Sequence, residues 1–175
     1  PKTSSAASDV YKRQDIEGGF VNDSPVELLD IFPTVCTLAG IPKPDDLDGI
    51  SLVPILEKKS EYLRDFAISQ YPRRCNVMRS VIGRYPDDCT LMGYAVRNEK
   101  YRYVAWISGD FEDRSDFNND EIVMEELYDY EIDPLETKSY ASDASYQKVK
   151  EEMIKDLRSV ISVSYTHLRA HETPI

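Results

Sequence analysis

Two runs of alternating residues occupy the middle of the chain and predict a β-hairpin. In MGYAVRNEKYRYVAW, Met92–Trp106, apolar or aromatic residues fall at every second position on both sides of a polar tetrad. A period of two with β-branched and aromatic residues is typical of strands. The tetrad contains Asn98, which tolerates a positive φ and suits a turn. The alternation of the second strand predicts one face with Tyr101, Tyr103, Ala105 and Ile107 and another with Arg102, Val104 and Trp106.

A helical period dominates the stretch VELLDIFPTVCTLAG, Val26–Gly40, where apolar residues recur every three or four positions. Proline is tolerated in the first turn of a helix but not in its interior. Pro33 therefore places the main helix at about Asp30–Ala39, with Asp30 as its N-cap. The preceding Ser24–Glu27 fits a capping box.

A second amphipathic stretch, Ala144–Ile161, predicts a helix near the end of the chain. Its apolar face consists of Val149, Met153, Ile154, Leu157, Val160 and Ile161. The shorter elements that we predict are a helical turn over Ser51–Glu57, a strand over Phe66–Tyr71, a long loop over Pro72–Thr90, a strand over Met124–Tyr130 and a turn over Ile132–Leu135.

This order of elements predicts an antiparallel sheet of about four strands with a helix packed on one face, an α+β arrangement within the α/β class. On such a sheet, aromatic residues at alternate positions usually pack across strands. We therefore interpret Tyr94, Tyr101, Tyr103 and Trp106 as packing residues rather than ligand contacts.

Composition narrows the possible partners. The chain has 175 residues and a net charge of −11, which argues against nucleic acid because its binders usually carry a basic face. No apolar run approaches the roughly 18 residues of a membrane span, and no secretory signal pattern opens the chain. Three cysteines at irregular spacing form no metal pair. Cys75 and Cys89 flank one loop and form either a disulfide or, as we prefer, two free thiols.

Two acidic stretches invite a calcium interpretation. DDLDG, Asp45–Gly49, does not keep the ligand register of an EF-hand, and for GDFEDRSDFNNDE, residues 109–121, a metal role is the alternative to a solvated loop. We expect both to be solvated loops.

Both ends of the chain look foreign to it. PKTSSAASDVYKRQ, residues 1–14, and VSYTHLRAHETPI, residues 163–175, continue no amphipathic period and resemble translated sequencing-adapter strings. We expect neither to belong to the native fold. His167 and His171, the only histidines, have a spacing that suits a metal on a helix, but both lie in the closing string.

Four stretches resemble, in order, the C-terminal part of the sulfatase superfamily, and within it the iduronate-2-sulfatase-like group. They are VELLDIFPTVCTLAGIPKPDDLDGISLVPIL, ISQYPRR, MGYAVRNEKYRYVAW and ELYDYEIDPLET. The resemblance implies an alkaline-phosphatase-like fold, with a large catalytic α/β domain and a smaller four-stranded antiparallel subdomain that ends in a helix. It assigns residues 15–60 to the end of the large domain and residues 61–162 to the subdomain.

The resemblance also implies chemistry that this chain does not carry. Family members cleave sulfate esters of sugars with calcium and a formylglycine made from Cys or Ser in C/S-x-P-S-R. Cys36, Cys75 and Cys89 all lack that context, so we assign no catalytic or metal-binding residue in this chain. Calcium, formylglycine, a sulfated carbohydrate substrate and a periplasmic or secreted location are implied for the full-length enzyme.

Gln70, Tyr71 and Arg73 are candidates for the rim of a substrate site, because they end a strand and open a long loop. An arginine there suits a carboxylate or sulfate. The alternative is that Arg73 pairs with an acidic neighbour and fixes the loop, and Arg97 and Arg102 have the same ambiguity. A phosphonate-monoester or phosphodiester hydrolase of the same superfamily, or a non-catalytic acidic binding module, remain the competing interpretations.

Overall fold

A computed structural model describes residues 16–74, 90–108 and 122–171, and the side chains within 16–73, 91–107 and 122–161. The chain divides into two compact units between Arg64 and Asp65. In the described residues no helix is long and apolar enough to cross a membrane. Cys75, Cys89 and the acidic stretch 109–121 lie outside the described residues.

The first unit contains η3 (Leu28–Asp30), α1 (Ile31–Ala39) and α2 (Val53–Leu56). The predicted main helix is confirmed, since α1 follows Asp30 and ends at Gly40, which adopts φ 68°. The predicted capping box is wrong by one turn. It joins Glu27 to Asp30, because Asp30 Oδ2 accepts the Glu27 N–H at 2.8 Å, while Ser24 Oγ accepts from the Leu63 N–H instead.

The buried Asp30 carboxylate organises this unit. Its side chain has no solvent exposure, and its Oδ1 accepts the Ile50 N–H at 2.8 Å and the Arg64 guanidinium at 2.5 Å. One turn later, Thr34 Oγ1 accepts the Leu52 N–H at 2.8 Å. Asp30 and Thr34 therefore hold the segment after α1 against the helix through its backbone. Arg64 compensates the buried charge, as a buried carboxylate requires.

The same packing requires that residue 49 be a glycine. A Cβ at this position would lie 2.6 Å from the Leu29 carbonyl carbon and closer still to its oxygen. The neighbouring atoms belong to the backbone, so they have little room to move. The glycine of the LDG sequence is thus required by the close approach of two chain segments, and not by a turn.

The second unit is built on four antiparallel strands in the order β1-β2-β3-β4. They are β1 (Ala67–Arg74), β2 (Thr90–Arg97), β3 (Tyr101–Ser108) and β4 (Ile122–Asp129). The predicted sheet and hairpin are confirmed, and Asn98 Oδ1 closes the hairpin by accepting the Lys100 and Tyr101 N–H groups. β1 runs three residues past its predicted end at Tyr71. Pro72 is tolerated there because β1 is an edge strand, which needs hydrogen bonds on one side only.

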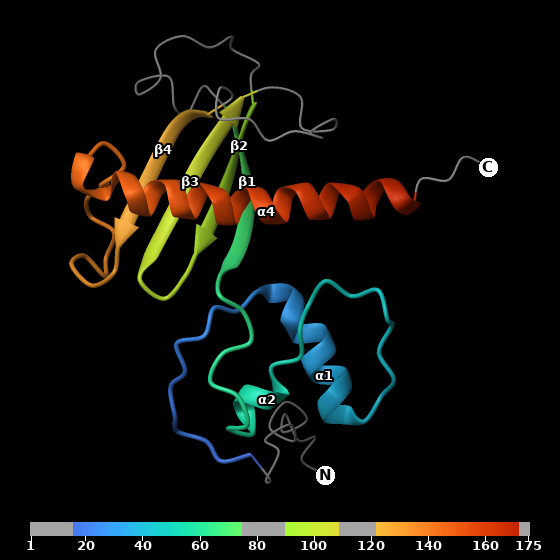
Figure 1. Ribbon diagram of the computed structural model, residues 1–175. Helices are drawn as coiled ribbons and strands as arrows, with labels where there is room; N and C mark the ends of the chain where they lie inside the picture. The colour runs from blue at the N-terminus through green and yellow to red at the C-terminus, as the bar shows by residue number, and fades with distance from the viewer. Residues whose placement is uncertain (1–15, 75–89, 109–121, 172–175) are drawn as a thin grey trace, which may run out of the picture. The chain divides into compact units, whose positions relative to one another are not determined.

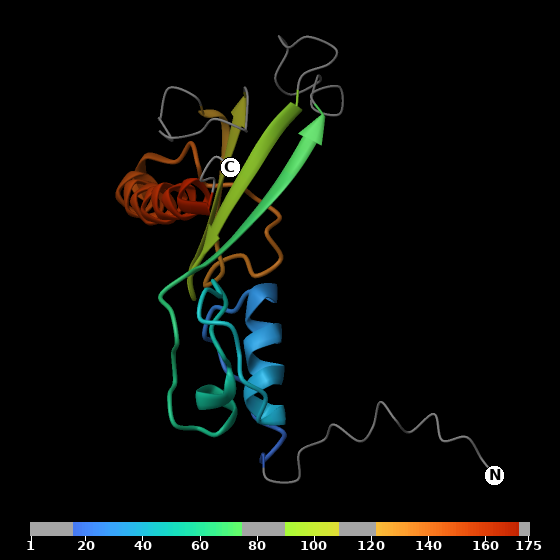
Figure 2. The same ribbon diagram turned by 90° about the vertical axis from the view of Figure 1, so that its right-hand side faces the viewer.

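Helix α4 (Gln147–His171), preceded by η5 (Ala144–Tyr146), crosses one face of this sheet (Figure 1). Figure 2 shows it along its axis beside the strands. The core between helix and sheet consists of Val96, Tyr103, Ala105, Ile107, Leu127, Met153 and Leu157. The packing interpretation of Tyr103 is confirmed, and Tyr94 and Tyr101 pack against the same core. α4 continues ten residues past its predicted end at Ile161, where the sequence offers no glycine or proline to stop it.

A polar contact fixes the helix on the sheet. Glu125, on β4, accepts the Tyr103 hydroxyl at 2.8 Å through Oε1 and the Lys150 ammonium at 3.1 Å through Oε2. Both partners are largely buried, so the contact fixes the register of α4 more than an exposed pair would.

We predict that Gly49→Ala destabilises the first unit by about 2–3 kcal/mol, because the added methyl group must displace the Leu29 backbone. The matched control is Gly18→Ala, whose Cβ meets nothing within 4 Å and should change stability by less than about 0.5 kcal/mol. Hydrogen exchange of the α1 amides measures the stability of the first unit in both variants. Equal protection of α1 in the two variants would contradict the prediction.

Candidate functional site

The structure separates the three predicted rim residues onto two faces of β1. Directly paired residues on antiparallel strands share a face. Gln70 pairs with Tyr94, which packs against the core under α4, so Gln70 lies on the helix side. Tyr71 pairs with Gly93 and lies on the opposite side, together with Arg73 two residues later. Gln70 therefore does not join Tyr71 and Arg73, because the period of two places it on the other face.

The Arg73 guanidinium lies over the indole of Trp106, with its carbon 5.1 Å from the ring centroid. Arg73 is exposed, whereas Trp106 keeps only 7% of its surface exposed. Among the described residues, Arg73 forms no ion pair. The alternative in which an acidic neighbour pairs with Arg73 thus finds no support in this part of the chain, and the observed partner is an aromatic face.

Gly93 makes this stacking geometrically possible. It sits on β2 directly opposite Trp106, and a Cβ on Gly93 would lie 2.8 Å from Cζ3 of the indole. The indole therefore extends across β2 in the space that a side chain would fill. A glycine inside a strand commonly marks such a close approach, and this was the available sequence signal for the role of Trp106.

The far edge of the indole is anchored on β4. Trp106 Nε1 donates to Glu126 Oε1 at 2.8 Å, and Tyr128 donates its hydroxyl to Glu126 Oε2 at 2.6 Å. Both carboxylate oxygens of Glu126 are thus engaged. The ring is held by β3, β4 and the gap at Gly93, which is the arrangement expected of a rigid support.

Further along the same face, Arg102 and Arg97 have structural partners. Arg102 lies over the Tyr128 ring at 5.1 Å and forms an ion pair with Glu136 at 2.5 Å. Arg97 lies over the Tyr130 ring at 4.6 Å. Tyr130 also donates its hydroxyl to Glu136, and the Arg102–Glu136 ion pair attaches the turn that follows β4 to the sheet face. We call the whole set the arginine–aromatic row: Arg73, Trp106, Glu126, Tyr128, Arg102, Glu136, Tyr130 and Arg97.

The tyrosines of this row remain neutral donors far above neutral pH. Burial, followed by the hydrogen bond to Glu126, raises the pKa of Tyr128 to about 12. Burial and the hydrogen bond to Glu136 likewise raise the pKa of Tyr130 to about 12. Both hydroxyls therefore keep donating to their carboxylates throughout the physiological range.

No metal centre accompanies these residues in the part of the chain that the structure describes. Within the described part of the chain, no group of three or more His, Cys, Asp and Glu side chains is placed to hold a metal ion. Cys36 is a buried free thiol on α1 and lacks the C-x-P-S-R context. The side chains of His167 and His171 lie outside the described ones. The described residues thus do not fit a formylglycine or a calcium site.

We predict that Glu136→Gln lowers the pKa of Tyr130 from about 12 toward its ordinary value of 10.0, because the carboxylate that holds the phenol proton loses its charge. A pKa raised on folding gives stability that is complete below pH 10 and is lost as the pH rises toward 12. The variant should lose less stability over that interval than the parent. A ring-carbon NMR titration of Tyr130 measures the shift, with Glu131→Gln as a control on an exposed pair with Lys100. An unchanged titration of Tyr130 would contradict this role of Glu136.

Comparison with known proteins places the chain in a family. The family model for N-sulphoglucosamine sulphohydrolase, C-terminal, matches residues 10–162. Among curated relatives, a Delta 4,5-hexuronate-2-O-sulfatase of Bacteroides thetaiotaomicron is 31% identical over 122 residues, covering 69% of this chain and 20% of the relative. An ulvan-active sulfatase of Formosa agariphila is 25% identical over 169 residues, covering 82% of this chain and 30% of the relative.

Solved structures agree with the sequence comparison. A 2-O GAG sulfatase matches with a TM-score of 0.62 and 26% identity, covering 91% of this chain and 30% of that one. A putative sulfatase from Bacteroides thetaiotaomicron matches with a TM-score of 0.56 and 28% identity, covering 83% of this chain and 26% of that one. This chain spans less than a third of the length of these relatives. It belongs to the sulfatase superfamily, in the family defined by the C-terminal region of N-sulphoglucosamine sulphohydrolase.

Proposed function

We propose that this chain is the C-terminal part of a sulfuric-ester hydrolase that acts on sulfated sugars. The observation that carries the proposal is the family match over residues 10–162, together with the same fold in a 2-O GAG sulfatase. An antiparallel sheet with one covering helix supports many functions, so the family match carries more weight than the fold.

The substrate class that we propose is a 2-O-sulfated uronate at the end of an oligosaccharide. Its support is the sequence similarity to the Delta 4,5-hexuronate-2-O-sulfatase, which is 31% identical to this chain, and the structural similarity to the 2-O GAG sulfatase. Tyr71 and Arg73 are the residues that we place at the rim of the site. Gln70 lies on the other face of β1 and is a weaker candidate.

Sulfate-ester cleavage by this proposal requires groups outside the present sequence. A formylglycine nucleophile and a calcium ion are the family's means of cleavage, and no cysteine or serine of this chain lies in C/S-x-P-S-R. This chain contributes to substrate binding and to the stability of the enzyme. The proposal extends to a periplasmic or secreted location, where sulfated polysaccharides are met.

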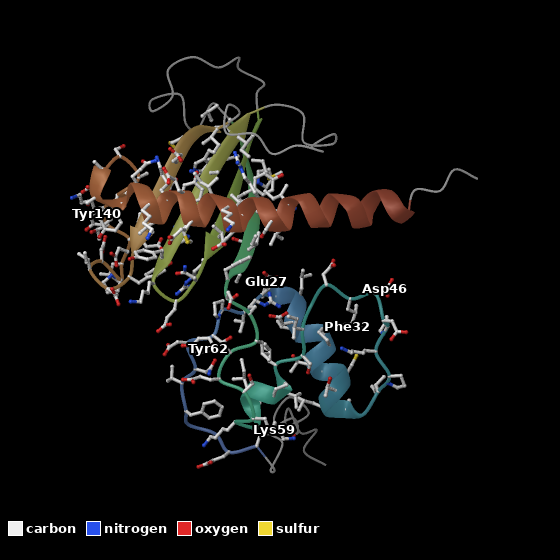
Figure 3. The ribbon with its side chains drawn as sticks, viewed as in Figure 1. Glu27, Phe32, Asp46, Lys59, Tyr62 and Tyr140 are labelled. Atoms are coloured by element: carbon white, nitrogen blue, oxygen red, sulfur yellow. The ribbon has the colours of Figure 1, made fainter. Side chains whose placement is uncertain are left out.

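Residues 15–60 complete the large catalytic domain in this proposal, and residues 61–162 form the subdomain. The support comes from the packing of α1, which exposes its larger apolar side chains Ile31, Phe32 and Val35. Its buried residues include the polar Thr34, whereas Leu28 is 86% exposed and Phe32, labelled in Figure 3, is 54% exposed. The full set of large apolar side chains exposed on and beside the helix is Val26, Leu28, Leu29, Ile31, Phe32, Val35 and Ile41. Such a patch marks a surface that another part of the protein covers, here the catalytic α/β domain.

The direct test of the function uses the complete gene product. With an unsaturated 2-O-sulfated uronate disaccharide, we expect calcium-dependent release of sulfate. The purified 175-residue chain should release none, because a hydrolase without its nucleophile loses many orders of magnitude in rate. Turnover of a phosphonate monoester in place of the sulfate ester would move the protein to the competing hydrolase class. Binding of the sugar without turnover of either ester would make it a non-catalytic module.

We also predict that Leu28→Glu and Phe32→Glu, introduced together, raise the solubility of the isolated chain without lowering its free energy of unfolding. Leu28 is 86% and Phe32 54% exposed, so their replacement removes apolar surface that lies mostly in solvent. The control is Cys36→Glu on the buried side of α1, which should cost several kcal/mol because it buries an unpaired charge. Sedimentation and urea unfolding measure the two effects. Loss of stability in the double variant would show that the exposed face already has a partner within the chain.

A further inference from the structure

Arg73 is exposed, and within the described residues its guanidinium forms no ion pair. Its carbon lies over the Trp106 ring, 5.1 Å from the ring centroid. The five N–H donors of a guanidinium lie in its plane and match the geometry of a carboxylate or sulfate. Two other arginines differ in this respect. Arg64 is held by Glu27 and Asp30, and Arg102 by Glu136.

We propose that Arg73 binds an acidic group of the sugar substrate, the uronate carboxylate or the sulfate ester, and that Trp106 is the positioning residue that aims it. This deepens the proposed function and rests on it. The ligand is an oxyanion on a pyranose ring, because the planar fork of the guanidinium pairs with two oxygens at once.

Tyr71 supports a sugar as the ligand of this site. Its side chain is 65% exposed and lies on the same face as Arg73. Tyr71 pairs with Gly93 on β2, and Gly93 pairs with Trp106 on β3. An exposed tyrosine offers an apolar ring and a polar tip, a combination that suits the carbon face and the hydroxyl groups of a pyranose. The edge strand β1 thus carries one stacking surface and one anion-binding group two residues apart.

The rigidity of the support explains how an exposed arginine achieves specificity. A free arginine side chain loses roughly 2 kcal/mol of rotamer entropy when it is ordered by a ligand. Stacking on the buried Trp106, itself fixed by Glu126 at 2.8 Å and by the gap at Gly93, orders the side chain beforehand. Preorganisation of this kind raises affinity by reducing the cost of binding.

Trp106 is the single tryptophan of the chain, so its fluorescence reports on this site alone. The experiment titrates the 175-residue chain with an unsaturated uronate disaccharide that carries a 2-O-sulfate, with the same disaccharide without sulfate, and with a neutral disaccharide. We expect a saturable fluorescence change with the acidic sugars and none with the neutral one. If the desulfated sugar binds as well as the sulfated one, the carboxylate is the ligand; if it does not, the sulfate is.

Arg73→Gln should weaken that binding about 10- to 100-fold, the range expected for one charge-assisted bidentate contact. The matched control is Arg97→Gln, which removes an exposed arginine stacked on Tyr130 of the same row and should leave the affinity unchanged. Arg73 is exposed, so its replacement should not disturb folding. Equal binding by Arg73→Gln and the parent chain, an equal loss in Arg97→Gln, or no saturable change up to about 10 mM sugar would overturn the proposal.

The positioning role of Trp106 needs a separate variant. Gly93→Ala pushes a methyl group into the indole and should weaken sugar binding while Arg73 remains in place. Trp106→Phe retains an aromatic face and should keep most of the affinity, measured by calorimetry because the fluorophore is gone. In the complete protein, Arg73→Gln and Gly93→Ala should raise KM for the disaccharide and leave kcat close to its original value.

The outcomes separate this inference from the proposed function. Sulfate release by the complete protein with an unchanged KM in Arg73→Gln would refute the anion site and leave the sulfatase assignment intact. Sugar binding that depends on Arg73, in a complete protein that releases no sulfate, would refute the assignment and retain the site. Normal affinity in a folded Gly93→Ala variant would refute the positioning role of Trp106.

Discussion

The indole of Trp106 lies in a space that exists only because position 93 is glycine, and the face of the sheet opposite α4 depends on this contact. The ring spans β2, reaches Arg73 on one side and donates to Glu126 on the other. Glu126 in turn engages Tyr128, whose ring supports Arg102. One small residue therefore permits a continuous set of contacts from the edge strand to the turn after β4.

In the first unit, close packing restricts position 49 to glycine in a similar way. Gly49 lets its segment approach the Leu29 carbonyl, and the Asp30 carboxylate then captures the Ile50 N–H. In both places, a glycine inside a recognisable family sequence serves close packing between segments and not backbone freedom. The buried side of α1 carries Pro33, Thr34 and Cys36, which leaves the exposed Ile31, Phe32 and Val35 for the catalytic domain that we propose.

The sequence allowed the strands, the hairpin and the main helices to be predicted, because their periodicity follows directly from which faces are buried. It did not reveal the capping box at Glu27–Asp30, because Ser24 offered an equally plausible cap one turn earlier. Nor did it separate Gln70 from Arg73, although strict alternation along β1 would have placed them on opposite faces. The stacking of Arg73 on Trp106 joins strands distant in sequence, so only the strand order and register could reveal it.

The central claim is that this chain serves as the C-terminal part of a sulfated-sugar sulfatase, and a chimera tests it most directly. Residues 15–162 would replace the corresponding part of the Delta 4,5-hexuronate-2-O-sulfatase to which this chain is 31% identical. Sulfate release from a 2-O-sulfated unsaturated uronate would then be measured. We expect a folded chimera that releases sulfate. A chimera that folds cooperatively, carries the relative's intact catalytic groups and releases no sulfate would contradict the claim.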